Sequence, residues 1–185
     1  MPRRAAFLDR DGVINRDIGY LHRWEDFDFL PGVLPAMRQL HEAGYALVIV
    51  TNQSGIARGF YSETDYEALT RKLRGAMAAN GSPAIGIYHC PHHPQGKVAA
   101  LALDCDCRKP RPGMLLRAAN ELGLSLAESI MVGDKLADAQ AGRAAGVGRV
   151  FLVRSGHALE LGAEAQADEV FEDLAACVDA LLSRG

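Results

Sequence analysis

Five short apolar runs alternate with segments of helical character, and this alternation restricts the possible folds more than any other feature of the sequence. The runs lie at 5–8, 45–50, 85–89, 129–132 and 149–153, and helical patterns lie at 32–43, 62–80, 112–122, 140–145 and 173–183. Short runs that are apolar throughout are typical of strands buried on both faces of a parallel sheet. We therefore predict an α/β fold, a doubly wound, Rossmann-like parallel sheet with helices on both faces.

Length and composition restrict the classes of protein to which this chain can belong. With 185 residues, 49% of them hydrophobic, the chain is expected to form a single domain over 1–185. The net charge is −3 and no long basic block occurs, which argues against nucleic acid as a partner. No apolar run reaches the length of a signal-peptide core or a membrane span. A cytoplasmic protein with no membrane partner is expected, and a single core permits a monomer.

Two aspartates follow the first apolar run. Asp9 and Asp11 are separated by one residue, so in an extended chain their side chains project on the same face. Two carboxylates held together repel each other, and they therefore favour a divalent cation or retention of a proton by one of them. A solvated polar turn before Gly12 is the alternative interpretation of this pattern.

Polar residues also follow other apolar runs. Thr51-Asn52-Gln53-Ser54 comes after the second run, where hydroxyl and amide groups can hold an oxyanion or simply cap the strand end. Arg108, Lys109 and Arg111 precede the helix at 112–122, where cations form an anion site or a solvated basic turn. Asp134 follows the fourth run. Because ligands bind at the carboxyl ends of parallel strands, we expect these side chains to meet at one site.

Three of the four cysteines lie in the segment 90–107. A Cys-x-His pair beginning at Cys90 is followed, after twelve residues, by Cys105-x-Cys107. This pattern predicts a closed, tetrahedral and therefore structural zinc site that staples a loop rich in Pro, Gly and Ala. Spacing alone does not choose between His92 and His93, and buried free thiols are the alternative. Cys177 lies far away on an apolar helical face and is expected in the core.

Four motifs occur in a characteristic order. They are Asp9-x-Asp11-Gly12, Thr51-Asn52, Lys109-Pro110 and Gly133-Asp134-x-x-x-Asp138. With these motifs at its strand ends, the chain resembles the haloacid dehalogenase superfamily of aspartate-nucleophile phosphohydrolases over nearly its whole length. The segments 90–96 and 105–110 resemble the branch that acts on heptose bisphosphate and histidinol phosphate. In that branch the first Cys-x-His pair binds zinc, which selects His92 beside Cys90, Cys105 and Cys107.

The resemblance implies a magnesium-dependent phosphomonoester hydrolase. Asp9 would be the nucleophile, which forms an aspartyl-phosphate, and Asp11 would be the general acid and base. Mg²⁺ would be held by the carboxylates of Asp9 and Asp134 and by the backbone carbonyl of Asp11. Thr51 and Lys109 would stabilise the transferring phosphoryl group.

The resemblance also implies the substrate and the residues that contact it. The intervals between the motifs leave no room for a cap domain, so the site is expected to be open, and Asp138 is expected to orient its neighbours. Arg108 would meet a second phosphate of the substrate, and Arg111 could add positive charge nearby. The implied substrate-binding residues are Asp17, Ile18, Gly19, Tyr20, Asn52, Gln53, Ser54, Arg108 and Lys135.

The expected substrate is a heptose 1,7-bisphosphate, which would lose its C7 phosphate during synthesis of nucleotide-activated heptose for the lipopolysaccharide core. Histidinol phosphate or another small phosphosugar is the alternative substrate, and a phosphotransferase could use the same site. A zinc-stapled binding module without catalytic activity is the alternative from another class of protein. The intact set of strand-end aspartates, threonine and lysine argues against that last interpretation.

Overall fold

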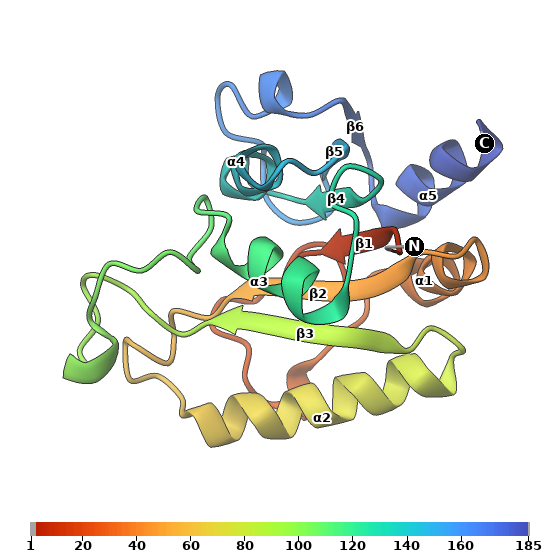
Figure 1. The fold of residues 1–185 in the computed structure, drawn as a ribbon. Coiled ribbons are helices and arrows are strands. Elements are labelled where there is room, and N and C mark those ends of the chain that lie inside the picture. The colour runs from red at the N-terminus through yellow and green to blue at the C-terminus, as the bar shows by residue number, and fades with distance from the viewer. Residues whose placement is uncertain (1–2, 185) are drawn as a thin grey trace.

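A six-stranded parallel sheet forms the centre of the protein (Figure 1) in a computed structural model that describes residues 3–184. The strand order is β3-β2-β1-β4-β5-β6, and every neighbouring pair is parallel. The strands are β1 (Ala5–Leu8), β2 (Ala46–Asn52), β3 (Ala84–Cys90), β4 (Ile130–Gly133), β5 (Arg149–Val153) and β6 (Glu169–Phe171). The doubly wound fold predicted from the alternating pattern is confirmed.

Helices cover both faces of the sheet. One face packs against α1 (Val33–Glu42), α2 (Glu63–Ala79) and α5 (Leu174–Ser183), and the other against α3 (Gly113–Leu122) and α4 (Leu136–Ala145). Successive residues of β1 enter opposite cores: Ala6 and Leu8 face α1 and α5, whereas Ala5 and Phe7 face α3 and α4. This is why the strands are apolar throughout. Cys177 is buried in the first of these cores, as predicted.

Local sequence signals set the ends of several helices. The Ser62 side chain accepts the N–H of Asp65, and the Asp65 carboxylate accepts the N–H of Ser62, which is the predicted capping box of α2. Gly123 ends α3 in the left-handed region, with φ of 63°, which glycine adopts without the strain of a Cβ.

Two strands are longer than predicted, and one was not predicted. β2 continues through Thr51 and Asn52, and β3 continues to Cys90, because each of these polar residues is still paired with the neighbouring strand. β6 is a half-buried edge strand of three residues, too short to show a periodic pattern. The segment that precedes it, 154–168, contains only the 3-10 turn η3 (Glu164–Gln166).

The topological switch point of the sheet lies between β1 and β4. The chain leaves β1 towards β2 on one side and returns to β4 on the other, which opens a crevice at the carboxyl ends of these strands. Among residues 3–184, the segment between β1 and β2 holds only η1 (Trp24–Asp26) and α1, and that between β3 and α3 only η2 (Ala99–Leu101). Neither insertion is large enough for a cap domain. The single domain over 1–185 remains a prediction, and residues 1, 2 and 185 lie outside the described part.

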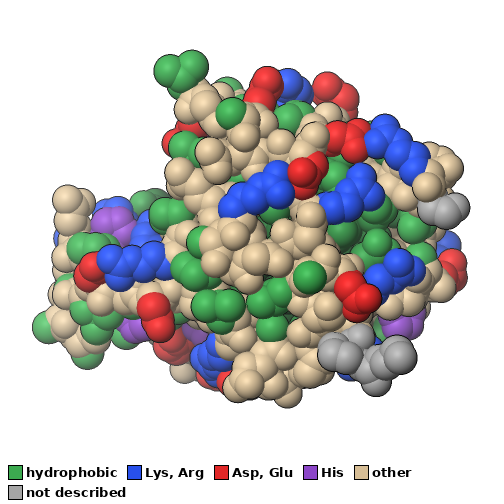
Figure 2. All heavy atoms as spheres, turned by 45° about the horizontal axis from the view of Figure 1, so that its top comes forward, with side chains coloured by type: hydrophobic (Ala, Val, Ile, Leu, Met, Phe, Trp, Pro, Cys, Tyr) green, Lys and Arg blue, Asp and Glu red, His purple; other side chains and the backbone are tan. Residues whose placement is uncertain are grey.

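The surface carries charges of both signs. On the face shown in Figure 2, Lys and Arg side chains lie among Asp and Glu side chains and do not form one broad basic patch. Within the described residues, no helix combines the length and the apolar character that crossing a bilayer requires.

Candidate active site

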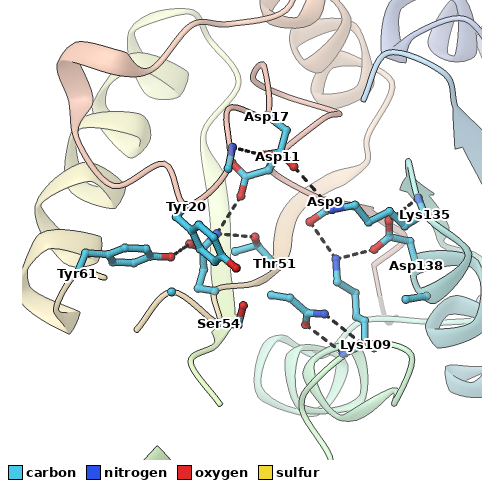
Figure 3. Close-up of a pocket in the computed structure, with 15 residues that line it drawn as sticks. Asp9, Asp11, Asp17, Tyr20, Thr51, Ser54, Tyr61, Lys109, Lys135 and Asp138 are labelled. Carbon is cyan, nitrogen blue, oxygen red and sulfur yellow. Dashed lines mark hydrogen bonds and ion pairs between the residues drawn. The ribbon is translucent and has the colours of Figure 1, made fainter. Parts of the chain in front are cut away.

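A cavity of about 330 Å³ opens at the carboxyl ends of the strands near the switch point (Figure 3). Most residues predicted for catalysis or substrate binding line it, whereas Ile18, with 53% of its surface exposed, and Arg108 are not among the lining residues. Asp134 lies buried beneath the cavity. The lining residues are Asp9, Asp11, Asp17, Gly19, Tyr20, Thr51, Asn52, Gln53, Ser54, Gly55, Tyr61, Lys109, Lys135, Ala137 and Asp138.

Lys109 is fixed in the floor of the cavity. Its ammonium group donates to Asp9 Oδ1 at 2.9 Å and to the backbone carbonyl of Val50 at 2.8 Å, and it lies 2.7 Å from Asp138 Oδ1. Only 3% of the residue is exposed. Burial alone would lower the pKa of Lys109, but Asp138 and Asp9 outweigh burial and raise it. Lys109 is therefore a permanent positive charge beside the Asp9 carboxylate.

The carboxylates of Asp9, Asp134 and Asp138 form a cluster that fits a divalent cation. One oxygen of each lies within 4.8 Å of the others. Asp134 Oδ1 is buried without a hydrogen-bond partner among the described residues, so this oxygen is available to bind a cation. Burial and the neighbouring carboxylates raise the pKa of Asp9, although Lys109 opposes this, and burial and Asp138 raise the pKa of Asp134. Burial is the largest cause of both shifts, and repulsion from neighbouring carboxylates adds to it.

Asp138 has a different environment from the other two carboxylates. Its Oδ2 accepts the backbone N–H groups of Asp134 and Lys135 at 3.1 and 3.0 Å, and its Oδ1 faces Lys109. Both oxygens are thus already occupied by donors of the chain. This geometry agrees with the expectation that Asp138 orients its neighbours.

Asp11 lies on the other side of Asp9 and is surrounded by donors. Arg10 binds both of its oxygens at 2.9 and 3.0 Å, Asn15 donates to Oδ1 at 3.0 Å, and Gln53 donates to Oδ2 at 3.1 Å. Because all of these groups donate, both oxygens of Asp11 act as acceptors in the described conformation.

Two of the predicted substrate-binding amides are engaged within the protein. Asn52 donates to the backbone carbonyl of Lys109 at 3.1 Å and accepts its N–H at 3.0 Å. Gln53 donates to Thr51 Oγ1 at 2.9 Å, and its Oε1 accepts the hydroxyl of Tyr61 at 2.5 Å. These amides therefore link neighbouring residues of the site to one another, whether or not they also contact a ligand.

Three side chains that make polar contacts at the site were not predicted: Arg10, Tyr61 and His157. Arg10 stands between the two predicted aspartates and is buried against Asp11. Tyr61 lies just before α2 and is brought to the cavity by the loop after β2. The Nδ1 atom of His157 lies 2.7 Å from Asp134 Oδ2. His157 lies in the loop after the fifth strand, Arg149–Val153, and no sequence motif marks it.

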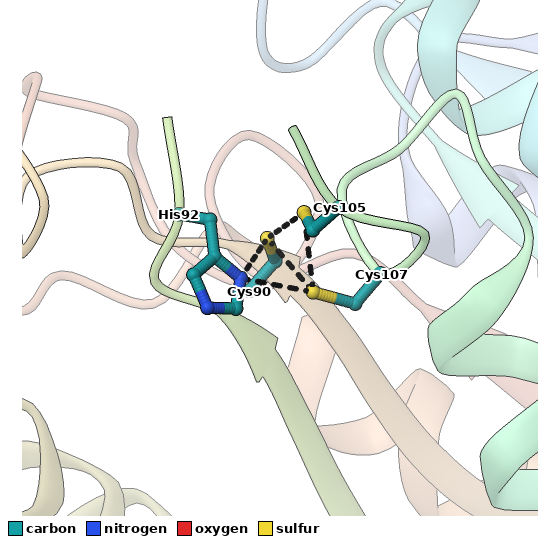
Figure 4. Close-up of side chains that lie close together, drawn as sticks. All are labelled: Cys90, His92, Cys105 and Cys107. Carbon is teal, nitrogen blue, oxygen red and sulfur yellow. Dashed lines mark hydrogen bonds between the residues drawn. The ribbon is translucent and has the colours of Figure 1, made fainter. Parts of the chain in front are cut away.

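The predicted zinc ligands come together at the end of β3 (Figure 4), where the four side chains point to a common centre. Cys90 Sγ lies 3.2 Å from Cys107 Sγ and 3.5 Å from Cys105 Sγ, and His92 Nδ1 lies 3.3 Å from Cys107 Sγ. These separations are too long for a disulfide and approach the edge of ~3.8 Å of a tetrahedron with Zn–S bonds of ~2.3 Å. The cluster therefore fits zinc.

Neighbouring residues that the sequence left open take other partners. His93 accepts a hydrogen bond from Arg58 at 3.0 Å and lies outside the cysteine cluster. Arg111, expected to add positive charge near the site, instead pairs with Asp104 at 2.7 Å and donates to the carbonyl of Cys105. It therefore braces the cysteine segment and does not line the cavity.

At the switch point of this parallel sheet an aspartate is held against a buried lysine, and further aspartates follow the fourth strand. This arrangement is that of the class of HAD-like hydrolases. A family model described as HAD-hydrolase-like matches residues 106–177. The chain is 53% identical over 171 residues to the D-glycero-beta-D-manno-heptose-1,7-bisphosphate 7-phosphatase of Escherichia coli K12. The match covers 92% of this chain and 90% of the relative. The chain thus belongs to the haloacid dehalogenase-like phosphatases, and within them to the family of the heptose-bisphosphate phosphatases.

Two further relatives are informative. The D-glycero-alpha-D-manno-heptose-1,7-bisphosphate 7-phosphatase of Photorhabdus laumondii is 46% identical, over 83% of this chain and 84% of that protein. The crystal structure of D,D-heptose 1,7-bisphosphate phosphatase from B. bronchiseptica, complexed with magnesium and phosphate, is 36% identical with a TM-score of 0.83 and covers 98% of this chain and 99% of that one. The relatives thus include enzymes named for both anomers.

Proposed function

We propose that this protein hydrolyses the C7 phosphate ester of D-glycero-D-manno-heptose 1,7-bisphosphate, in the synthesis of nucleotide-activated heptose for the lipopolysaccharide core. The observation that carries this proposal is the Asp9 carboxylate held 2.9 Å from the buried Lys109 ammonium in an uncapped cavity. The surroundings of the Asp9 carboxylate suit a nucleophile that attacks phosphorus while the fixed ammonium group balances its negative charge. The names of the relatives supply the substrate.

In this proposal Asp9 forms a bond to phosphorus as the bond between phosphorus and the C7 oxygen breaks. Lys109 fixes Oδ1 of Asp9, so the second carboxylate oxygen is the one that attacks. Asp11 gives a proton to the leaving sugar oxygen and then takes one from the water that attacks the aspartyl-phosphate. Because Asp11 is surrounded by donors, carrying the proton requires release of one of them, such as Gln53. Thr51 and Lys109 balance the charge on the transferring group.

Mg²⁺ would be held by the carboxylates of Asp9 and Asp134 and the backbone carbonyl of Asp11. When bound, it supplies positive charge that allows one anion to attack another. Asp138 holds the Asp134 turn through two backbone N–H groups. Lys135, which lies 3.6 Å from Asp17, and Arg108 are the cations assigned to the substrate and to its second phosphate.

Zinc is proposed as the structural ion of the segment 90–107, with Cys90, His92, Cys105 and Cys107 as ligands. Burial raises the pKa of the Cys90 and Cys107 thiols, and a bound cation would offset this by stabilising the thiolates. Free thiols suit a reducing compartment such as the cytoplasm. All assigned site residues come from one chain, so a monomer suffices, and no nucleic acid is required.

The test is phosphate release from a panel of substrates with Mg²⁺. We expect kcat/KM for one anomer of the heptose 1,7-bisphosphate to exceed that for histidinol phosphate and other phosphosugars by at least about 100-fold. The Asp9→Asn variant should lose at least about 10³-fold of kcat, because an amide does not replace the nucleophile. Comparable or faster hydrolysis of histidinol phosphate would refute the substrate assignment. Absence of release from every phosphosugar would favour a binding module, and transfer to alcohols would indicate a phosphotransferase.

A further inference from the structure

The segment Ser155-Gly156-His157, in the loop after β5, contacts both turns that carry the carboxylates of the site. We propose that His157 is a positioning residue for the cation site: its Nδ1–H holds Oδ2 of Asp134 so that Oδ1 is left for the divalent cation. The inference rests on the proposed function only in taking Asp134 as a ligand of that cation. None of the sequence motifs includes this segment.

Three successive residues build the contact. Ser155 Oγ donates to the backbone carbonyl of Gly12 at 2.8 Å. Gly156 packs so closely that a Cβ there would clash with the Asp134 carboxylate and lie 2.8 Å from the Gly12 Cα. His157 Nδ1 then lies 2.7 Å from Asp134 Oδ2. Glycine at 156 thus permits the close approach that brings the imidazole to the carboxylate.

The two oxygens of Asp134 consequently have different environments. Oδ2 is occupied by His157, whereas Oδ1 is buried and has no partner among the described residues. A Cβ on Gly12 would also clash with Oδ2, so the carboxylate lies between two glycines that leave little room for rotation. A ligand held in one orientation loses less entropy when it binds a cation, and such outer partners tune metal affinity.

The same imidazole reaches the wall of the cavity. His157 Nε2 lies 3.4 Å from Asp17 Oδ2, and Asp17 also lies 3.6 Å from the Lys135 ammonium. His157 has 46% of its side chain exposed and belongs to none of the hydrophobic clusters of the described residues. We therefore assign its role to its two polar contacts more than to packing. Substitutions can separate the contact with Asp134 from the contact with Asp17.

Asn and Gln distinguish the two ring nitrogens. The amide nitrogen of Asn falls near the position of Nδ1, whereas that of Gln falls near the position of Nε2. His157→Asn should therefore keep the contact with Asp134, and His157→Gln should keep only the contact with Asp17. We expect the Mg²⁺ Kd of the zinc-loaded full chain, measured by calorimetry, to rise at least about tenfold in His157→Gln. In His157→Asn it should stay within about threefold of wild type.

The matched control is His41→Gln, on the exposed side of α1, which should bind Mg²⁺ like the wild type. Equal affinity in wild type, His157→Asn and His157→Gln would overturn the inference, as would equal weakening in both variants. If the wild type hydrolyses heptose bisphosphate but His157→Gln binds Mg²⁺ as tightly as the wild type, the inference is refuted and the proposed function is not. The predicted pattern of affinities in a protein that hydrolyses no phosphosugar would refute the proposed function alone.

Discussion

At the scale of single residues, Asn52 shows how a side chain of the site can act through the backbone. Its amide makes two hydrogen bonds with the backbone of Lys109, 57 positions further along the chain. Lys109 in turn is the only ammonium group within hydrogen-bond distance of Asp9 among the described residues. Asn52 therefore fixes the distance between the proposed nucleophile and its fixed cation.

This arrangement predicts the kinetic consequence of Asn52→Ala. Loss of both hydrogen bonds lets the Lys109 backbone shift, and a misplacement of ~1 Å can cost about 100-fold in rate. We expect kcat to fall about 10–100-fold with KM changed less than about threefold. Steady-state kinetics on the phosphosugar substrate is the measurement. If Asn52 instead served mainly to bind substrate, KM would rise while kcat stayed unchanged.

The sequence predicted those site residues that directly follow a strand. Asp9, Thr51 and Asp134 lie at the carboxyl ends of parallel strands, and the period of the strands and the topology of the sheet are enough to bring them together. Tyr61 and His157 could not be placed in this way. Their positions depend on the path of a loop, which is set by contacts such as that of Tyr61 with Gln53 and has no periodic signal.

At the scale of elements, the segment 90–107 joins the end of β3 to the residues just before Lys109. It contains one 3-10 turn and little apolar packing of its own, so its conformation depends on the four clustered ligands. The paired Cys/His spacing made the cluster predictable. The selection of His92 over His93 required the resemblance. In the structure His92 lies in the cluster with the three cysteines, whereas His93 contacts Arg58.

Zinc removal should therefore affect both stability and activity. In Cys105→Ser we expect loss of the bound zinc, a lower Tm and loss of most activity that added Mg²⁺ does not restore, because the segment that leads to Lys109 loses its staple. Elemental analysis and thermal unfolding are the measurements. Cys177→Ala is the matched control for zinc content, since this cysteine lies on the core-facing side of α5 and not in the cluster. One zinc per chain in Cys105→Ser with unchanged Tm would contradict the prediction.

The unpredicted edge strand β6 is fixed by Asp168, the residue before it. Asp168 Oδ2 accepts the Val150 N–H at 2.7 Å, and its N–H donates to the Val150 carbonyl at 2.7 Å. Burial alone would raise the pKa of Asp168, but the Arg143 guanidinium and the Val150 N–H outweigh burial and hold it below its usual range. A carboxylate whose pKa is lowered on folding stabilises the protein above the unfolded pKa, and this contribution is lost as pH falls through the folded pKa.

Asp168→Ala should therefore destabilise the protein in a pH-dependent way. About 1 kcal/mol is expected at pH 7 from the lost hydrogen bond, with the partly exposed ion pair to Arg143 discounted for solvent screening. The difference from wild type should shrink below about pH 4, where the wild-type carboxyl becomes protonated. Urea unfolding at pH 7 and pH 3 measures both values. A difference that does not decrease at pH 3 would exclude the charge of Asp168 as its cause.

At the scale of the whole molecule, the fold places three buried carboxylates together at the switch point. The strand order was not determined by the sequence pattern, which is compatible with several arrangements of parallel strands, but the observed order puts β1 and β4 side by side. The carboxylates after these strands are thereby brought together with Asp138. Since burial and repulsion from other carboxylates of the cluster, Asp138 first, raise the pKa of Asp9 and Asp134, the ionised cluster costs stability at neutral pH.

A divalent cation that binds this cluster should stabilise the whole protein. At a free Mg²⁺ concentration 100 times its Kd, the gain is about 2.7 kcal/mol, or about 5–10 °C in Tm for a chain of this length. Asp134→Asn should abolish the shift, and its metal-free Tm should be equal to or above that of the wild type because one repelling charge is removed. Thermal unfolding at matched ionic strength, with Na⁺ as the control salt, measures both effects. An equal Mg²⁺ shift in wild type and Asp134→Asn would place the cation elsewhere.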